Sequence, residues 1–130
     1  MIITKDEIKK RFIDYNKLYF NNSLPMCKFS VLNQNVSAFG RYTHSYDKNK
    51  SIIGHIWISN KVNWTENALQ EVIIHEMIHH YLYSIKHKCG GIFGHNWRFR
   101  KVCRYLKRNY NLDIHTHCFH LMYLRKKPMK

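Results

Sequence analysis

The chain has 130 residues, of which 45% are hydrophobic and 15% aromatic, a composition that excludes a disordered protein and predicts one globular domain over residues 1–130. No apolar run approaches the roughly 20 residues that a membrane-spanning helix needs, and the N-terminus carries charges where a signal peptide has its apolar segment. The four cysteines are scattered without a C-x-x-C pair, which favours free thiols in a reducing compartment. We therefore expect a cytoplasmic monomer without a membrane partner.

The formal net charge of +14 is concentrated in the C-terminal third of the chain. Residues 1–85 contain 10 Lys and Arg against 7 Asp and Glu, whereas residues 86–130 contain 12 against the single Asp113. A segment with so little acid indicates a polyanionic partner such as nucleic acid. A surface that only keeps the protein soluble is the alternative.

The N-terminal half predicts one helix followed by a small sheet. Thr4 and Glu7 form a capping box, after which apolar residues recur at helical spacing until the stop signal FNNSLP. Three short segments rich in β-branched and aromatic residues follow, separated by turn-forming residues. They are KFSVL (28–32), SAFGRY (37–42) and SIIGHIWIS (51–59), and we expect them to form a small antiparallel sheet.

The C-terminal half predicts two more helices. Asn63 and Glu66 form a second capping box, which opens a helix that runs to about Ser84. After a glycine-bearing loop we expect a third helix over residues 95–109, and the loosely alternating residues 112–124 indicate a last strand. The expected fold is therefore α+β, with a small antiparallel sheet packed against three helices.

The second helix carries the chemically unusual stretch EVIIHEMIHHYL. His75 and His79 are four residues apart, so a helix stacks both imidazoles on one face, as a zinc ion with ligands at about 2.0–2.1 Å requires. Glu76 follows the first histidine, where its carboxylate lies beside the metal and can take a proton from a water molecule that the metal acidifies. H-E-x-x-H at this spacing predicts a zinc hydrolase, with two purely structural histidines as the alternative.

A catalytic zinc site also needs a third protein ligand and an open fourth position. Leu82 and Ile85 stand where the pattern H-E-x-x-H-x-x-G-x-x-H has its glycine and last histidine, so that pattern is excluded. A later glutamate is excluded as well, because none follows Glu76. The third ligand is therefore expected to be another histidine.

Six histidines are candidates for this position: His80, His87, His95, His115, His117 and His120. His95 is favoured because it opens the third helix on the same face as Phe99, which is expected to point into the core. His80 is rotated by about 100° from His79 on one helix, so the two cannot readily share an ion. A surface position and a contact with a ligand both remain open for His80.

The residues HEMIHHYL, followed by a glycine-bearing loop and GHNWRF, resemble the SprT-like (Spartan-type) zinc metallopeptidases. LYFNNSLP, AFGRY and IWIS also resemble that family in order and spacing, so the resemblance covers roughly residues 8–108. It implies a zincin-like fold with the motif on the second helix and one zinc ion per chain, held by His75, His79 and His95, with Glu76 as general base. It further implies proteolysis coupled to DNA, typified by the removal of crosslinked proteins.

Two features depart from the family pattern. Asn96 follows the third histidine, where the family usually has glycine. Many members also carry a C-terminal zinc ribbon with four cysteines, and this sequence has no such set, so targeting to DNA through a ribbon is not expected.

The third helix offers another contact with DNA. Four basic residues follow one stripe of it: Arg98, Lys101, Arg104 and Arg108. The opposite stripe is apolar and is expected to be buried: Phe99, Val102, Cys103, Leu106 and Tyr110. A basic stripe without acid predicts phosphate contacts, and tyrosines such as Tyr105 or Tyr123 could stack on unpaired bases. An ordinary solvated face is the alternative.

Further segments suggest additional roles. HTHCFH contains four potential metal ligands: His115, His117, Cys118 and His120. On a strand these residues point to two opposite faces, so they cannot bind one ion without a bend. SIIGHIWIS fits either an edge strand that pairs with a substrate backbone or a plain core strand. The residues weighed as oxyanion-stabilising donors are Tyr42, His44 and His55.

Together these features predict a zinc-dependent endopeptidase that acts on DNA-bound or DNA-crosslinked proteins, so its partners would be protein substrates and DNA. The alternative is a nucleic-acid-binding module with a structural zinc and no catalysis, in which a fourth ligand such as Cys89 or Cys103 would close the site. A zinc hydrolase of another bond is a third possibility, because a nucleophile and a Lewis acid do not specify the bond.

Overall fold

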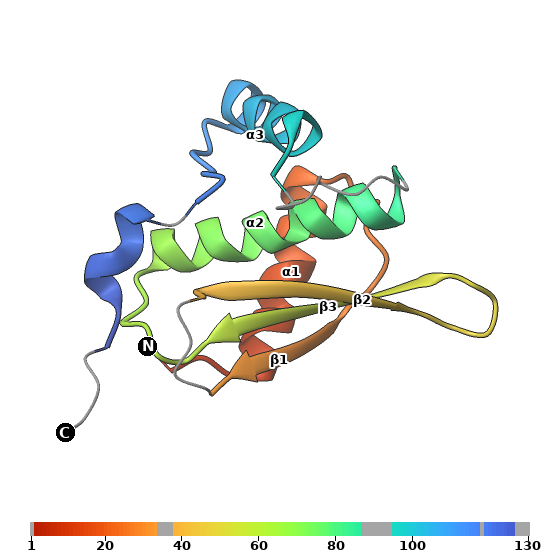
Figure 1. Ribbon diagram of the computed structural model, residues 1–130. Helices are drawn as coiled ribbons and strands as arrows, with labels where there is room; N and C mark the ends of the chain where they lie inside the picture. The colour runs from red at the N-terminus through yellow and green to blue at the C-terminus, as the bar shows by residue number, and fades with distance from the viewer. Residues whose placement is uncertain (1, 34–37, 87–94, 118, 127–130) are drawn as a thin grey trace.

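The computed structural model describes residues 2–33, 38–86, 95–117 and 119–126 (Figure 1). Its elements in chain order are α1 (Lys5–Tyr19), β1 (Lys28–Leu32), β2 (Gly40–Tyr46), β3 (Ile52–Ser59), α2 (Glu66–Ser84), α3 (Trp97–Tyr110) and the 3₁₀ helix η1 (Phe119–Leu124). Three helices and one small sheet confirm the α+β fold.

The sheet is mixed, so the expectation of a wholly antiparallel sheet was wrong in one pairing. Its strand order is β1-β3-β2. β2 and β3 form an antiparallel hairpin, in which Asp47 Oδ1 accepts hydrogen bonds from the amides of Asn49 and Ser51. β1 pairs with the other side of β3 in parallel, with Phe29 opposite Ile56. The pattern within each segment predicts a strand but carries no information about which neighbour lies beside it.

β3 is therefore the central strand, and its possible role as a substrate-binding edge strand is excluded. Its alternate residues Ile56 and Ile58 are fully buried, in line with the plain core strand that was the other interpretation. The outer edge that lies beside α2 belongs to β2 instead.

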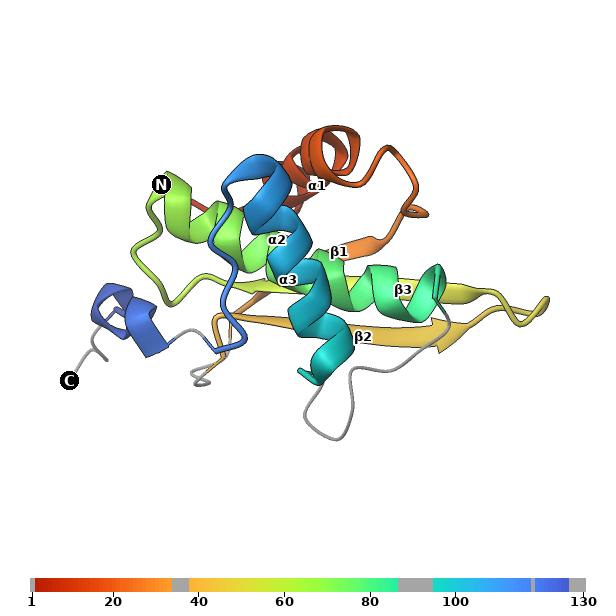
Figure 2. The same ribbon diagram turned by 90° about the horizontal axis from the view of Figure 1, so that it is seen from above.

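The helices pack in layers on this sheet. α2 lies along the sheet against β2 and β3, α1 packs against α2 and β1, and α3 crosses α2 on the side away from the sheet (Figures 1 and 2). α2 has buried residues around most of its circumference because it has neighbours on several sides: Ala68, Leu69, Val72, Ile73, Ile74, Met77, Ile78 and Leu82. The candidate metal ligands of α2 therefore lie in the middle of the protein.

The starts of two helices differ from the expected positions. Thr65 caps α2, since its Oγ1 accepts the amide proton of Ala68, and the expected capping box at Asn63 does not form. The backbone amide of Asn63 donates instead to the carbonyl of Leu124. Asn96 caps α3 through the amide of Arg98, so the helix starts two residues later than expected. The Thr4 cap of α1 is confirmed.

Residues 112–124 do not form the expected last strand. Their described part is irregular up to residue 117 and then continues as η1. Leu121 and Leu124 are buried, and Leu112 and Ile114 pack on the core, so the alternation of apolar residues reflects separate core contacts. An isolated bridge between Val62 and Arg125 follows directly after η1.

Some expectations fall outside the described residues. They concern the loop of residues 87–94, which contains His87 and Cys89, and Cys118, one of the four potential metal ligands of HTHCFH. Within the segments that are described, every helix is too short or too polar to cross a membrane.

Candidate metal centre

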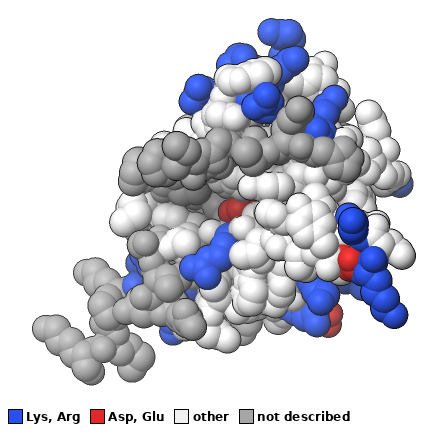
Figure 3. All heavy atoms as spheres, turned by 45° about the vertical axis from the view of Figure 1, so that its right-hand side comes forward, with Lys and Arg blue, Asp and Glu red and all other residues white. Residues whose placement is uncertain are grey.

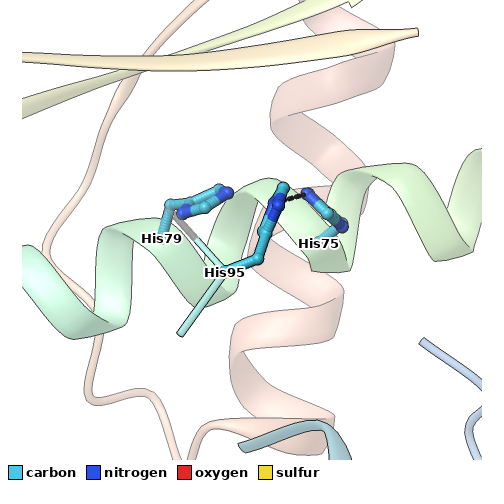
Figure 4. A group of neighbouring side chains, drawn as sticks. All are labelled: His75, His79 and His95. Carbon is cyan, nitrogen blue, oxygen red and sulfur yellow. Dashed lines mark hydrogen bonds between the residues drawn. The ribbon is translucent and has the colours of Figure 1, made fainter. Parts of the chain in front are cut away.

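Three histidines from two parts of the chain converge beside α2. His75 and His79 come from successive turns of α2, and His95 comes from the residue before the Asn96 cap of α3 (Figure 4). One nitrogen of each imidazole lies within 4.8 Å of a nitrogen of the other two. The structure thus brings together all three residues of the sequence-based ligand set, although His95 lies just outside the helix that it was expected to open.

Phe99 supports all three imidazoles. Its ring centroid lies 4.8 Å from the ring centroids of His75, His79 and His95, and its side chain is fully buried. Phe99 lies in the first turn of α3 and His95 lies just before the cap of that helix, so the start of α3 positions both residues against α2. Packing on one aromatic ring fixes the orientation of the three side chains.

The hydrogen bonds of His75 define its tautomer. Its Nδ1–H donates to the backbone carbonyl of His115 at 2.9 Å, since a carbonyl can only accept. Its Nε2 therefore carries a lone pair, which accepts a hydrogen bond from Nε2 of His95 at 3.0 Å. Nδ1 of His95 is buried without a partner among the described residues.

This donor set fits a zinc-type metal ion. Imidazole nitrogens are preferred ligands of zinc, and a ligand histidine usually donates its second ring nitrogen to a carbonyl or carboxylate, as His75 does. Without an ion, Nε2 of His75 can only accept the proton of His95 Nε2, and this tautomer leaves Nδ1 of His95 buried without a partner among the described groups. A cation between the three rings would bind the lone pairs of both Nε2 atoms instead.

Electrostatics keep the three imidazoles neutral. Burial lowers the pKa of His75 to about 4 and that of His79 to about 3. The pKa of His95 is also lowered by burial, with a further contribution from His117. Because only neutral imidazoles bind metal ions, the three residues are in the binding form at neutral pH.

Glu76 directly follows His75 on α2 and is buried. Its residue is 5% exposed, and burial raises the pKa of its carboxyl to about 8. Gly40 at the start of β2 leaves room for this carboxylate: a Cβ on Gly40 would lie 2.9 Å from Oε2 of Glu76. A cation held by the three histidines would favour the charged carboxylate and so turn Glu76 into a proton acceptor.

His80, which the sequence left without a role, is a fully buried structural residue. Its Nε2–H donates to the carbonyl of Pro25 at 2.7 Å, and its Nδ1 accepts from the hydroxyl of Tyr42 at 2.8 Å. Tyr42 in turn stacks on His79 with ring centroids 6.3 Å apart. His80 therefore links β2 and the segment after α1 to the helix that carries the motif.

The other donors weighed for oxyanion stabilisation also have partners within the protein. His55 hydrogen-bonds to Ser30 Oγ, and the ring of His44 packs on Tyr83. The hydroxyl of Tyr42 is already engaged with Nδ1 of His80.

The C-terminal segment contributes contacts that the sequence did not indicate. His115 supplies its carbonyl to His75, and the ring of His117 lies 5.5 Å from that of His95. The side chains of His115 and His120 bind Glu71 instead of the central cluster. These contacts join residues from 22 to 49 positions apart, and no local spacing in the sequence indicates them.

The basic stripe of α3 lies on the surface, as expected. Lys101, Arg104 and Arg108 are exposed and Arg98 is half-buried. Lys and Arg side chains gather over α3 at the top of Figure 3. Among the described residues none of the four forms a salt bridge, because the nearby Asp113 pairs with Lys107. Tyr110, expected to be buried, is 37% exposed.

His75, His79 and His95 converge around one point, and the buried Glu76 lies on α2 together with the first two. This arrangement defines a candidate metal centre of the hydrolase type. The sequence matches the SprT-like family over residues 8–123, and the chain belongs to that family. No curated protein sequence matches the chain.

Proposed function

We propose that this protein is a zinc-dependent endopeptidase of the cytoplasm that cleaves DNA-bound or DNA-crosslinked proteins. The observation that carries the proposal is the convergence of His75, His79 and His95 beside the buried carboxyl of Glu76. Membership of the SprT-like family supports the same chemistry. The free thiols of Cys27 and Cys103 fit a reducing compartment.

Each residue has a separate task in this chemistry. His75, His79 and His95 would hold the zinc ion, which supplies a Lewis acid that polarises a carbonyl and acidifies water. Glu76 would take the proton from the attacking water and later deliver it to the leaving amine. The bond from Nδ1 of His75 to the carbonyl of His115 keeps the Nε2 lone pair directed into the cluster.

β2 is the element best placed to bind a peptide substrate. Its outer edge pairs with no other strand in the described segments, and its residues alternate between half-buried and exposed up to Thr43. Gly40 adjoins Glu76 and Tyr42 stacks on His79, so the edge passes the candidate centre. An extended peptide added to this edge would gain backbone hydrogen bonds with little dependence on its sequence.

A pocket between the end of α1, the end of α2 and α3 supports the proposed contact with DNA. It has a volume of about 650 Å³, and its lining combines aromatic Tyr81, Trp97 and Tyr105 with basic Arg98 and Lys101. The guanidinium of Arg98 lies over the Trp97 ring at 4.7 Å. Aromatic platforms beside positive charges are typical of sites for unpaired bases and their phosphates. Arg104 and Arg108 would extend this surface along the phosphate backbone.

The second candidate function is a nucleic-acid-binding module whose zinc is structural. Such a site is usually closed by four protein ligands. Cys103, one of the two expected fourth ligands, is not a member of the three-histidine group, and the other, Cys89, lies outside the described residues. The buried Glu76 beside the group favours catalysis, because a structural site gains nothing from this carboxyl.

The test is cleavage of a protein that is crosslinked to single-stranded DNA. Wild type, Glu76→Gln and His79→Ala are compared for zinc content and for cleavage products, and the uncrosslinked protein serves as a second substrate. We expect Glu76→Gln to retain zinc and lose at least about 100-fold in rate, as loss of a general base requires. Unchanged cleavage by Glu76→Gln would exclude the mechanism. No cleavage by a zinc-loaded wild type would favour the binding module.

A further inference from the structure

A second cluster of metal-binding side chains lies one turn before the first on α2. Glu71 Oε2 lies 3.0 Å from Nδ1 of His115, and Glu71 Oε1 lies 2.9 Å from Nε2 of His120. The two imidazole rings are 4.0 Å apart between centroids. One ligand atom of each residue lies within 4.8 Å of the other two. We propose that Glu71, His115 and His120 form a second site for a divalent transition-metal ion.

The expected strand had argued against an ion in this segment, and the structure removes that argument. Residues 112–117 are irregular and η1 follows, so His115 and His120 approach each other while the ring of His117 lies near His95. The third ligand comes from α2, which the local spacing of HTHCFH does not reveal. The ligand set therefore differs from the four residues that the sequence suggested.

The surroundings of Glu71 indicate more than a surface ion pair. Its side chain is 13% exposed, yet in the described structure it pairs with two imidazoles and with no Lys or Arg of this strongly basic protein. Each imidazole gives this carboxylate one hydrogen bond, and neither carries the permanent charge of a Lys or Arg side chain. A divalent cation between the three groups would compensate the charge and use both imidazole lone pairs.

The donor chemistry selects the class of ion. Two imidazole nitrogens and one carboxylate suit zinc, cobalt or nickel, whereas magnesium and calcium prefer oxygen ligands alone. Tetrahedral ligands at about 2.0–2.1 Å from zinc lie roughly 3.3 Å apart, so the two contacts of Glu71 need to open by only a few tenths of an ångström. The side chains of His115 and His120 are 50% and 37% exposed, which leaves access for the ion and for a water ligand.

This site would fasten the C-terminal segment to α2. The same residue that binds Glu71 through its side chain, His115, holds Nδ1 of His75 through its backbone carbonyl. An ion at Glu71 would therefore fix the position of this carbonyl and, through it, the orientation of a ligand in the first cluster. The second ion would position His75 without touching the substrate.

The experiment counts zinc ions in the full chain. Chelator-stripped protein is titrated with Zn²⁺ against a competing indicator, and the bound zinc is then measured by elemental analysis. We expect two equivalents for wild type and one for His115→Ala/His120→Ala, a variant that keeps the carbonyl at position 115. We also expect one equivalent for His75→Ala/His79→Ala, and two for the control His44→Ala, which alters an exposed histidine outside both clusters.

The other outcomes would overturn the proposal. One equivalent in wild type, with none in His75→Ala/His79→Ala, would mean that Glu71 and its two histidines form hydrogen bonds only. Two equivalents in His115→Ala/His120→Ala would place the second ion elsewhere. Glu71→Gln, which keeps the shape of the side chain, repeats the count should the double variant fold poorly. Because the readout is zinc binding, the result is independent of any peptidase activity.

Discussion

The backbone carbonyl of His115 accepts a hydrogen bond from Nδ1 of His75 at 2.9 Å. This bond connects the irregular C-terminal segment to the first histidine of the H-E-x-x-H motif, 40 residues earlier in the chain. It decides which ring nitrogen of His75 carries the proton and leaves the other free for an ion.

The tautomer of His75 is the first prediction. In metal-free protein at pH 7 we expect a neutral ring with its proton on Nδ1, because burial lowers the pKa of His75 to about 4. Long-range ¹H–¹⁵N NMR spectra of the histidine rings distinguish this tautomer from the Nε2–H form. The exposed His44 serves as an internal comparison in the same spectra. A His75 ring protonated on Nε2, or one that titrates near 6.5, would contradict the hydrogen bond to His115.

The pH dependence of stability provides a second prediction, for metal-free protein. Burial raises the pKa of Glu76 from its ordinary value of 4.5 to about 8 in the folded state, so the folded state binds this proton more tightly than the unfolded state. The stabilising contribution is present below pH 4.5 and is lost as the pH rises towards 8. Glu76→Gln cannot ionise, and its free energy of unfolding should exceed that of wild type by about 3 kcal/mol at pH 7.

Urea unfolding of both proteins at several pH values measures this difference. The excess stability of Glu76→Gln should grow steadily between pH 5 and 8, and the comparison between the two proteins cancels the titration of the histidines. A difference that stays constant with pH would show that the carboxyl of Glu76 ionises as readily in the folded state as in the unfolded state.

Gly54 should not tolerate a side chain. A Cβ at this position would lie 2.5 Å from Nδ1 of His80 and 2.6 Å from the hydroxyl of Tyr42. Gly54→Ala should therefore lower the free energy of unfolding by about 1–3 kcal/mol, through displacement of this hydrogen-bonded pair. Urea unfolding measures the change, with Ser51→Ala, at the exposed residue just before β3, as control. Equal stability of the two variants would mean that β3 and α2 are not in close contact here.

The start of α2 can be tested with two neighbouring substitutions. Thr65→Ala removes the oxygen that accepts the amide proton of Ala68 and should cost about 1 kcal/mol of stability. Asn63→Ala should change stability by less than about 0.5 kcal/mol, because its contact with Leu124 uses the backbone amide. Chemical denaturation of both variants checks this. The reverse order of effects would restore Asn63 as the cap.

The proposed DNA surface predicts a change in salt dependence. Arg98→Glu/Lys101→Glu should weaken binding to single-stranded DNA and make the slope of log K against log salt shallower by about 2, if both residues meet phosphates. Fluorescence anisotropy across a range of salt concentrations measures the slope. Lys48→Glu/Lys50→Glu makes the same change of charge at an exposed turn beyond β2. An equal effect of both variants would indicate attraction by net charge and no defined surface.

The sequence predicted the helices of the fold better than the arrangement of its strands. Spacing of apolar residues and caps such as Thr4 are local signals, and they located α1, α2 and α3 to within a few residues. Which strand lies beside which depends on contacts between distant segments, so the parallel pairing of β1 with β3 could not be read from any one stretch. For the same reason, the alternating apolar residues of 112–124 were interpreted as a strand, whereas Leu121 and Leu124 contact the core from a 3₁₀ helix.

The candidate site shows the same division. The i, i+4 spacing places His75 and His79 together on any helix, and it indicated the metal centre directly. His95 was predicted as the third ligand because it was expected to share a buried helix face with Phe99, but it lies just before that helix. The family resemblance supplied the other argument for His95. The roles of His80 and His115 rest on hydrogen bonds to Pro25, Tyr42, His75 and Glu71, which only the folded chain brings near.

The packing of the three imidazoles on Phe99 has a consequence for how the protein responds to the loss of its metal. The ring lies 4.8 Å from each of them and belongs to the main hydrophobic core of the protein. In small zinc domains the ion supplies the energy of folding, so losing it unfolds the chain. Here Phe99 and the buried apolar residues around it supply that energy instead, so we expect a chelator to empty the three-histidine site without unfolding the chain.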